Sequence, residues 1–474
     1  MKRNQLYAAL FLLLCSGLTL LFPSCEKEEE TTIYEPDGTV NEARLAKKVN
    51  QFVTDYAKDY YLWTSTVNWK TVDPAADVNS FDFFQRLVYS DDKWSMLTND
   101  IQGLESEFEG VSTTFGYVLI FGRFSDTNAL FAVVLYVYPD TPADRAGVKR
   151  GDFIISLNGE MITEENYTDL YYAPSVTIGK GVLAGNAIAP ETSVSMTAVN
   201  MYENPILKDT VIVKGANRIA YLCYADYTME SERPLQEVFS RYRATGVTDV
   251  VLDLRYNGGG YAQTSVVLSS ILAPADVVKR KDIFTTLIWN DILTAYFKEM
   301  GEDVNEYYTD TLSVNMDLKR VFILMSEHTA SASESTIIGL DPYMDVVRIG
   351  TATHGKYCGG MLFSKENDKE ISNWGMYLMV YRFANKNGVT SFTGGLEPDL
   401  EVEEDYFPLF PFGDERDPLL GMALETITGQ SSFRKQIDKS LPPHSILKTK
   451  RRGTLVGKRI LNRTLHGFND STMQ

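Results

Sequence analysis

The spacing of apolar residues changes twice along the chain and divides it into three predicted domains. Between residues 41 and 103 apolar side chains recur at helical spacing, which predicts a small helical domain. From 104 to 212 short apolar runs such as 130–137, separated by turn residues, predict a β domain. From 213 to 429 strand-like apolar runs alternate with helical ones, which is typical of an α/β domain with a mostly parallel sheet. We therefore expect a multidomain α/β protein.

The composition is that of a folded protein and excludes several function classes. Of the 474 residues, 44% are hydrophobic and 23% are charged, so the chain is not mostly disordered. The net charge of -18 argues against a nucleic-acid partner, because a phosphate backbone attracts clustered Lys and Arg. The four histidines and four cysteines lie apart, without metal-ligand spacing. We expect neither a metal nor a cofactor.

The N-terminus has the pattern of an export signal. Lys2 and Arg3 precede an apolar run at 8–22, which is about as long as a signal-peptide core and short for a membrane-spanning helix. A small residue followed by Cys25 resembles a bacterial lipoprotein cleavage site. Residues 1–24 are thus predicted to be a signal peptide, and Cys25 is predicted to carry lipid. A plain secretory signal with an incidental cysteine is the alternative.

The segments that flank the predicted domains are strongly charged. Residues 25–40 form a predicted lipidated, acidic linker, and its acidic start resembles the surface-export signal of Bacteroidetes lipoproteins. These features predict an outer-membrane lipoprotein of the cell envelope, periplasmic or surface-exposed, which touches the membrane through its lipid anchor only. Residues 430–474 are predicted to be a flexible basic tail, either solvated, folded back on the acidic body or in contact with an anionic surface.

Three polar segments each follow a predicted parallel strand, namely 257–260, 331–334 and 355–356. The carboxyl ends of parallel strands share one edge of a sheet, where open α/β sheets place their sites. A helix and a strand between Ser331 and Lys356 return the lysine to the edge that the serine occupies. A serine hydroxyl needs a base, and a buried lysine can act as one because burial disfavours the ammonium form. Free N–H groups at a helix start and in a glycine turn would stabilise an oxyanion.

Each of these signals also has a purely structural interpretation. Ser331 and Glu334 match a capping box, which satisfies the first N–H groups of a helix. The glycines can belong to an ordinary strand-to-helix turn, and Lys356 can be a surface charge. His354 or His328 is an alternative base for the serine. Only the combination of the three segments favours a catalytic site.

In this order, the motifs resemble the C-terminal processing peptidases, also called tail-specific proteases, which are Ser-Lys endopeptidases with a PDZ domain. The resemblance covers about residues 41–428 and is carried by segments 253–260, 329–334, 350–356 and 395–399. It implies a helical N-terminal domain (41–103), a PDZ-like domain (104–212) and a Ser-Lys peptidase domain (213–429) with a crotonase-like or ClpP-like core.

The resemblance also implies the roles of individual residues. Ser331 would be the nucleophile and Lys356 the general base. The backbone N–H groups of Ala332 and of the glycine turn, Gly259 first, would form the oxyanion hole. Glu334 would support the site by orienting it, or would only cap the helix.

One position departs from the family pattern. Many bacterial members carry a glutamine four residues after the lysine, where this chain has Gly360. A catalytically weak or inactive peptide-binding lipoprotein is therefore the alternative to an active peptidase. A hydrolase of small esters or lipids is a third possibility, which a PDZ domain makes unattractive.

The segment 142–152 resembles the PDZ domain of these enzymes, and Phe115, Gly116 and Tyr117 resemble its carboxylate-binding loop. Bare N–H groups in such a loop hold a C-terminal carboxylate while the peptide adds as a strand to the sheet edge. An ordinary glycine within a strand is the alternative. The resemblance thus predicts an envelope serine endopeptidase whose partners are proteins or peptides with unstructured C-termini.

Overall fold

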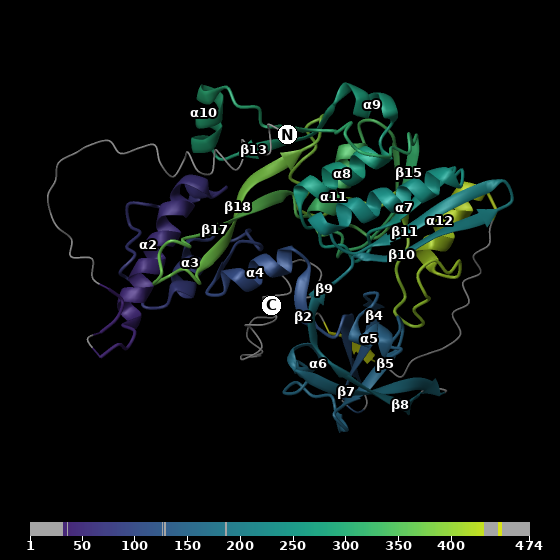
Figure 1. Ribbon diagram of the computed structural model, residues 1–474, viewed down its shortest axis with the longest axis horizontal. Coiled ribbons are helices and arrows are strands. Elements are labelled where there is room, and N and C mark those ends of the chain that lie inside the picture. Colours follow the sequence, from purple (N-terminus) through teal and green to yellow (C-terminus); the bar gives the residue numbers. More distant parts are fainter. Residues whose placement is uncertain are drawn as a thin grey trace.

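The computed structural model describes residues 32–430, except 36, 126, 128, 185 and 186, together with residues 444–447. The predicted signal peptide, Cys25 and most of the basic tail lie outside the described residues. Figure 1 shows the α/β domain, which is called the catalytic domain after the role that the sequence predicts for it, at the upper right. The PDZ-like domain lies below it, and an arm of two long strands reaches left to the N-terminal helices.

The catalytic domain is built on a six-stranded sheet in the order β10-β11-β12-β15-β16-β19. From β11 onward all neighbours are parallel, as the alternation of apolar runs predicted, whereas β10 pairs with β11 in antiparallel fashion. The strands are β10 (Ile206–Lys214), β11 (Asn217–Tyr224), β12 (Asp249–Asp253), β15 (Arg320–Met325), β16 (Asp345–Gly350) and β19 (Leu400–Glu401).

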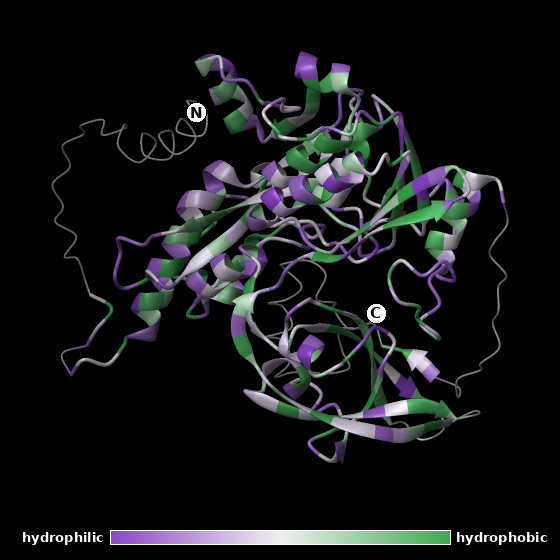
Figure 2. Cartoon of the chain, turned by 45° about the vertical axis from the view of Figure 1, so that its right-hand side comes forward, coloured by the Kyte–Doolittle hydropathy of each residue, from purple (hydrophilic) through white to green (hydrophobic). Residues whose placement is uncertain are grey.

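Helices cover both faces of this sheet, and alternate strand residues point to each face. Val250 and Leu252 of β12 pack in the core beneath α7 (Glu232–Ala244), α8 (Ala262–Leu272) and α11 (Ala332–Leu340). Val251 packs in the opposite core, under α12 (Pro418–Thr428). Figure 2 shows that apolar residues are concentrated on the inner strands and helices of this domain.

A second, antiparallel sheet was not predicted from the sequence. It pairs a strand of the N-terminal region with strands of the catalytic domain, in the order β1-β18-β13-β14, with β17 also on β18. The strands are β1 (Met96–Thr98), β13 (Ile283–Trp289), β14 (Asn305–Tyr307), β17 (Cys358–Ser364) and β18 (Gly375–Ala384). The N-terminal helices α2 (Glu42–Tyr60) and α3 (Ser80–Leu87) share one core with β17 and β18. The helical region is therefore packed onto the catalytic domain. Three further helices are α4 (Ile101–Phe108), α10 (Asp291–Met300), which follows β13, and α9 (Ala275–Arg280), which packs in the core of the catalytic domain.

The PDZ-like domain is a seven-stranded antiparallel sheet with its own core. Its short helix α5 (Pro142–Arg145) starts with Thr141 as the cap and with proline in the first turn. The other elements are β3 (Tyr117–Phe124), β4 (Leu130–Val137), β5 (Phe153–Leu157), β6 (Glu160–Met161), α6 (Asp169–Tyr172), β7 (Ser175–Ala184) and β8 (Ala187–Thr197). A separate ribbon of β2 (Val111–Thr114) and β9 (Val199–Tyr202) leads into the domain.

The described part of the C-terminal tail forms a strand of the PDZ-like sheet. Strand β20 (His444–Ile446) pairs antiparallel with the end of β3, and Ile446 lies opposite Gly122. Leu447 continues the pairing, because its N–H donates to the carbonyl of Phe121 at 2.9 Å. Of the alternatives considered for the tail, these residues follow the one in which the tail folds back on the molecule, and a solvated tail does not describe them.

A buried ionic network joins the PDZ-like domain to the catalytic sheet. Arg150 donates to Glu404 at 2.6 Å, and Glu404 also accepts from Arg255 at 2.8 Å. Arg255 further binds Asp417 and Asp253. Burial alone would raise the pKa of Glu404, but the two guanidinium groups hold it well below its usual value. Arg255 lies just before the glycine turn of the predicted site, so the network anchors that turn to the PDZ-like domain.

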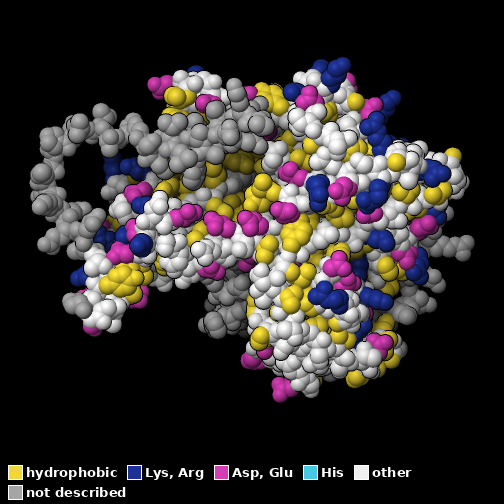
Figure 3. Space-filling view, viewed as in Figure 1, with side chains coloured by type: hydrophobic (Ala, Val, Ile, Leu, Met, Phe, Trp, Pro, Cys, Tyr) yellow, Lys and Arg dark blue, Asp and Glu magenta, His cyan; other side chains and the backbone are white. Residues whose placement is uncertain are grey.

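Three observations concern the molecules that the protein could contact: the charge on its surface, the character of its helices and the placing of metal-binding side chains. On the face shown in Figure 3, acidic and basic side chains are intermixed over the right-hand body. In the described part of the chain, no helix has both the length and the apolar character needed to cross a membrane. Among the same residues, no group of three or more His, Cys, Asp and Glu side chains is arranged to hold a metal ion.

Candidate active site

Ser331 lies on the turn between β15 and α11, at the predicted edge of the parallel sheet. Its backbone φ is 58° and its ψ is -112°, a region that side-chain-bearing residues rarely adopt. The helix that follows is buried at every position, whereas Ser331 itself is partly exposed. The turn thus leaves Ser331 partly accessible at this edge of the sheet.

The glycine turn lies directly against this serine. A Cβ atom added to Gly259, which has a φ of 104°, would lie 2.7 Å from Ser331 Cβ and 3.0 Å from the Ala332 nitrogen. Only glycine fits so close an approach. The Gly259 N–H donates to Asn257 Oδ1 at 2.9 Å, so it would have to share or leave this bond to bind an oxyanion. The Ala332 N–H opens helix α11, where backbone donors have no partner within the helix.

Glu334 connects the serine turn to the lysine segment. Its carboxylate accepts hydrogen bonds from the backbone nitrogens of Ser331 (2.7 Å), Gly355 (2.7 Å) and Lys356 (2.9 Å). The hydroxyl of Thr353 donates to it at 2.6 Å. Oxygen Oε2 receives the N–H groups of both Ser331 and Lys356, so the two predicted catalytic residues share one acceptor atom. The two interpretations of Glu334, a helix cap and a support of the site, are therefore compatible.

Burial sets the protonation of this carboxyl group. Glu334 is completely buried, and desolvation raises its pKa to about 7, although the four hydrogen bonds favour the charged form. Thr353 also fixes the next segment, because its hydroxyl accepts from the N–H of Leu396 at 2.7 Å. The sequence analysis did not identify Thr353, which has no local pattern that distinguishes it from other loop threonines.

Lys356 is buried, with 4% of its surface exposed. It precedes β17 and borders an apolar cluster drawn from two distant parts of the chain. Trp94, Met96, Ile101 and Leu104 come from the N-terminal region, and Tyr357, Cys358, Tyr377 and Met379 come from the arm. Lys356 Nζ lies over the ring of Tyr377, 5.4 Å from its centroid. The interpretation of Lys356 as a plain surface charge therefore does not hold.

The two histidines considered as alternative bases occupy other environments. His354 is exposed, and its Nε2 accepts a hydrogen bond from the indole of Trp94 at 3.4 Å. His328 Nε2 lies 3.3 Å from Glu327. Lys356 is the candidate base whose backbone is tied to the carboxylate that also binds Ser331, which favours the lysine.

Gly360 lies at a bulge where β17 pairs with β18. A Cβ atom at this position would lie 2.6 Å from Cζ of Tyr377 and would also collide with the side chain of Met379. A glutamine therefore does not fit here while the Tyr377 ring keeps its place.

Three models of known families match the chain, and they follow one another along it in the same order as the three predicted domains. Peptidase family S41 matches residues 218–402, the PDZ domain matches 133–173, and the Peptidase S41 N-terminal domain matches 48–96. Residues 218–402 thus match peptidase family S41, and a PDZ domain and the N-terminal domain of S41 peptidases match the residues ahead of them.

Curated proteins that resemble this chain share a low level of sequence identity with it. The chain is 25% identical over 289 residues to the chloroplastic C-terminal processing peptidase of Tetradesmus obliquus, which covers 58% of each protein. It is 24% identical over 289 residues to the carboxy-terminal processing protease CtpA of Bacillus subtilis, covering 59% of this chain and 56% of the relative. The match thus spans less than two thirds of the length of these relatives.

A solved structure supports the fold. The crystal structure of a candidate S41 protease from Bacteroides fragilis matches with a TM-score of 0.69 and 24% identity, over 80% of this chain and 97% of that one. The arrangement of a helical N-terminal region, a PDZ-like domain and a mixed α/β domain is therefore a fold that this solved structure shares.

The predicted carboxylate-binding loop of the PDZ domain has a suitable backbone but no open donor at its centre. Gly116 has a φ of 88°, and a Cβ atom there would overlap Thr141. Its N–H donates to the hydroxyl of Thr114 at 2.8 Å. Phe115 and Tyr117 are each 1% exposed and pack in the core of the domain. The two aromatic residues thus support the loop from inside.

The peptide edge of β3, which starts at this loop, is already in contact with other parts of the chain. The N–H of Leu119 donates to the hydroxyl of Tyr171 at 3.1 Å. Two residues further on, Phe121 accepts from Leu447 of the tail. A peptide that adds to this edge has to replace these contacts.

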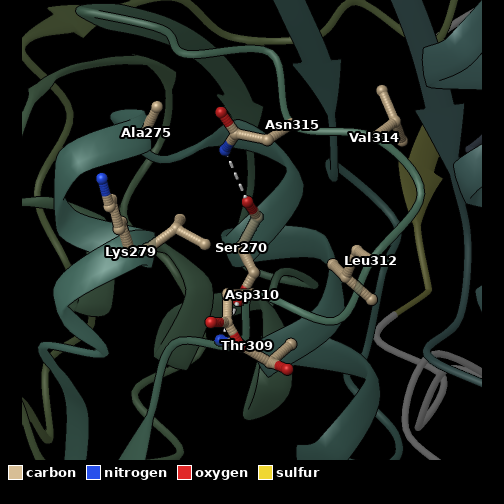
Figure 4. Close-up of a pocket in the computed structure, with 9 residues that line it drawn as sticks. Ser270, Ala275, Lys279, Thr309, Asp310, Leu312, Val314 and Asn315 are labelled. Carbon is tan, nitrogen blue, oxygen red and sulfur yellow. Dashed lines mark hydrogen bonds between the residues drawn. The ribbon is translucent and has the colours of Figure 1, made fainter.

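A pocket elsewhere on the S41 domain is separate from the Ser331 site. It lies between α8, α9 and the 309–315 segment, where the amide of Asn315 donates to the carbonyl of Ser270 at 2.8 Å (Figure 4). Lys279 and Asp310 are the charged residues of its lining. None of the predicted catalytic residues lines it.

Cys223 and Cys358 are buried free thiols.

Proposed function

We propose that this protein is a serine endopeptidase that cleaves protein substrates through an acyl-enzyme on Ser331, with Lys356 as the general base. The observation that carries the proposal is the shared carboxylate: Glu334 Oε2 binds the backbone N–H groups of both residues. The match to peptidase family S41 and relatives that are named carboxy-terminal processing proteases support the same reaction class.

The reaction follows from the chemistry of the two side chains. Lys356 Nζ takes the proton of the Ser331 hydroxyl as the oxygen attacks the substrate carbonyl, whose electron pair moves onto its oxygen. The N–H of Ala332 and a donor of the glycine turn, Gly259 first, stabilise that oxyanion. When the tetrahedral intermediate collapses, the lysine returns the proton to the leaving amine. Water then attacks the acyl-enzyme by the same route and releases Ser331.

The decisive experiment measures degradation of casein by protein that lacks residues 1–25. Ser331→Ala and Lys356→Ala should each reduce turnover by roughly a thousandfold or more, because residues of one catalytic unit fail together. Ser313→Ala and Lys369→Ala, at positions away from the site, are the matched controls and should keep full activity. Activity that survives Lys356→Ala but is lost in His354→Ala would transfer the base role to the histidine.

The second candidate function is a peptide-binding lipoprotein without turnover, which Gly360 favours because the family glutamine is missing. Under this alternative, purified wild-type protein binds peptides but neither degrades casein nor labels Ser331 with a fluorophosphonate probe. Labelling of the wild type that is absent in Ser331→Ala would exclude it.

The PDZ domain is the proposed receptor for unstructured C-terminal ends of substrates. The positive φ of Gly116 and the strand edge of β3 support this role, since peptides bind such domains by adding a strand. Binding of a labelled peptide with a free carboxylate, compared with its C-terminal amide, tests it. Equal binding of the two peptides would contradict capture of the carboxylate.

The proposed location is the cell envelope, with acylated Cys25 as the anchor. The support is the sequence pattern at residues 1–30. Cys25→Ala should move the protein from the membrane fraction to the soluble fraction of cells. Added protease acting on intact cells separates surface display, in which the protein is degraded, from a periplasmic location, in which it is protected.

A further inference from the structure

The ring of Tyr377 is the aromatic surface next to the candidate base. Lys356 Nζ lies 5.4 Å from the ring centroid, and the two residues are 4% and 8% exposed. A cation over the face of an aromatic ring is attracted by the ring's electron density, and the attraction grows when water is excluded. Because both side chains are buried from water, the attraction between the Lys356 amine and the Tyr377 ring is expected to be strong.

Strand pairing on both sides holds the Tyr377 backbone in place. Tyr377 lies on β18, opposite Met96 of β1 and opposite Leu362 of β17. The ring of Phe108 packs against the Tyr377 ring at a centroid distance of 5.1 Å. Neighbours from three elements thus restrict the tyrosine, so it can serve as a fixed platform for a flexible lysine side chain.

Gly360 provides the space that this ring occupies. A Cβ atom at Gly360 would lie 2.6 Å from Cζ of Tyr377. The adjacent Gly359 has the same relation to Tyr381, whose ring would also collide with an added Cβ atom. Two successive glycines of β17 therefore each contact a tyrosine of β18. The lysine amine lies over the ring of Tyr377, the tyrosine that Gly360 contacts.

We propose that Tyr377 is a positioning residue for Lys356, whose ring face orients the lysine amine and stabilises the ammonium that forms as Ser331 loses its proton. This inference rests on the proposed function. The attraction is stronger after proton transfer than before it, because only then does the lysine carry its full charge. An interaction that strengthens toward the transition state raises kcat, whereas uniform binding would change KM alone.

The test compares kcat and KM of three variants in which a tyrosine is replaced. Tyr377→Leu should lower kcat roughly ten- to thirtyfold with little change in KM, which is the range of a desolvated cation–π contact. Tyr377→Phe keeps the ring and should keep most of the activity. Tyr381→Leu removes the neighbouring ring from the same strand and is the matched control for packing. Equal losses in Tyr377→Leu and Tyr381→Leu, or a full loss in Tyr377→Phe, would overturn the proposal.

A double-mutant cycle adds a second measure of the coupling. Gly360→Ala should lower kcat by displacing the ring, and adding it to Tyr377→Leu should cause little further loss, because the ring is already gone. Gly359→Ala is the control for crowding. Independent, additive losses would argue that Gly360 and Tyr377 do not act through one contact.

A readout that does not depend on turnover separates this proposal from the proposed function. Protein labelled with ¹³C at lysine Cε should show the Lys356 protons shifted upfield by the ring, with the signal assigned by its absence in Lys356→Arg. The shift should persist in Tyr377→Phe and vanish in Tyr377→Leu. An unshifted signal in the wild type refutes the positioning role even if casein is cleaved. A shifted signal in a protein that does not cleave casein refutes only the proposed function.

Discussion

In the proposed function two edges bind a peptide. The catalytic edge consists of residues 257–260, 331–334 and 355–356, and the PDZ edge is the side of strand β3 that does not pair with β4. The two edges differ in what their polar groups contact. At the catalytic edge the supporting groups bind one another around Glu334, and Ser331 stays partly exposed. At the PDZ edge the strand backbone is bound by Tyr171 and by the tail residue Leu447. The first site is assembled and open, whereas the second is assembled and covered. The proposed catalytic site can therefore be assembled while the proposed peptide-binding edge is occupied by other parts of the same chain.

Among the changes that test this comparison, the largest effect is expected from removing the carboxylate that organises the catalytic edge. Glu334→Ala leaves the N–H groups of Ser331, Gly355 and Lys356 without their acceptor in a buried place. We expect a loss of kcat of roughly a hundredfold or more, comparable to that of other supporting groups in catalytic sites. Glu334→Gln keeps one acceptor oxygen and should lose less. Similar activity of the alanine variant and the wild type would show that the edge is organised by other groups.

The second largest effect is expected from breaking the ionic network that joins the PDZ-like domain to the catalytic sheet. Arg150→Ala leaves Glu404 buried with one of its two guanidinium partners removed. We expect the free energy of unfolding to fall by about 3 kcal/mol, as for other broken buried pairs. Denaturant titration measures the change, and Lys214→Ala, in a more exposed pair with Glu415, is the control. A change of the size seen in the control would mean that the network does not hold the domains together.

The raised pKa of Glu334 predicts how the stability and the activity of the protein change with pH. Burial raises the pKa of Glu334 to about 7, above its value in the unfolded chain. The folded state therefore takes up a proton between these two pKa values, so the contribution of Glu334 to stability is largest below the unfolded pKa and is lost as the pH rises through about 7. Activity should change in the opposite direction, because the ionised carboxylate accepts all of its hydrogen bonds.

Unfolding titrations at several pH values, with Glu334→Gln as the reference, check this dependence. The difference in stability between wild type and variant should shrink with rising pH, and the variant's activity should lack the step near neutrality. Parallel pH profiles in the two proteins would contradict the assignment.

The smallest expected effect concerns the covered PDZ edge. Leu447→Pro removes the N–H that binds Phe121, and proline has no replacement donor. In a Ser331→Ala background, a fluorescent peptide that copies residues 440–447 should bind the variant roughly three- to tenfold more tightly, the value of about one hydrogen bond. Ser445→Ala, at an exposed side chain on the same strand, should bind as before. Unchanged affinity in Leu447→Pro would show that the tail does not compete for the edge.

The parts of the site that follow from chain connectivity could be predicted from the sequence. A strand, a helix and a second parallel strand necessarily return Lys356 to the edge of Ser331, and the pairing of β15 with β16 confirms that geometry. The capping box at Ser331 and Glu334 was visible as a local spacing. Its second role, binding the Lys356 segment, depends on a contact across the site that no local pattern encodes.

The parts that depend on long-range pairing were not predicted. Tyr377 reaches Lys356 only because β17 and β18 pair in a particular register, with Leu362 opposite Tyr377. Strand β1, in the predicted helical domain, pairs with β18 far along the chain. Residues 444–447 lie in a segment whose charge suggested a solvated tail, and the apolar side chains of Ile446 and Leu447 are the only local sign of their packing.

The mixed origin of the apolar cluster beside Lys356 has a consequence for the newly made protein. Trp94 and Met96 are synthesised long before Tyr377 and Met379, and the cluster exists only when these segments meet. Until then Lys356 has neither the ring of Tyr377 beside its amine nor the apolar neighbours that exclude water from it. A growing or half-folded chain thus carries the proposed nucleophile before the surroundings of its proposed partner exist, and the site is complete only when both ends of the catalytic half have folded together.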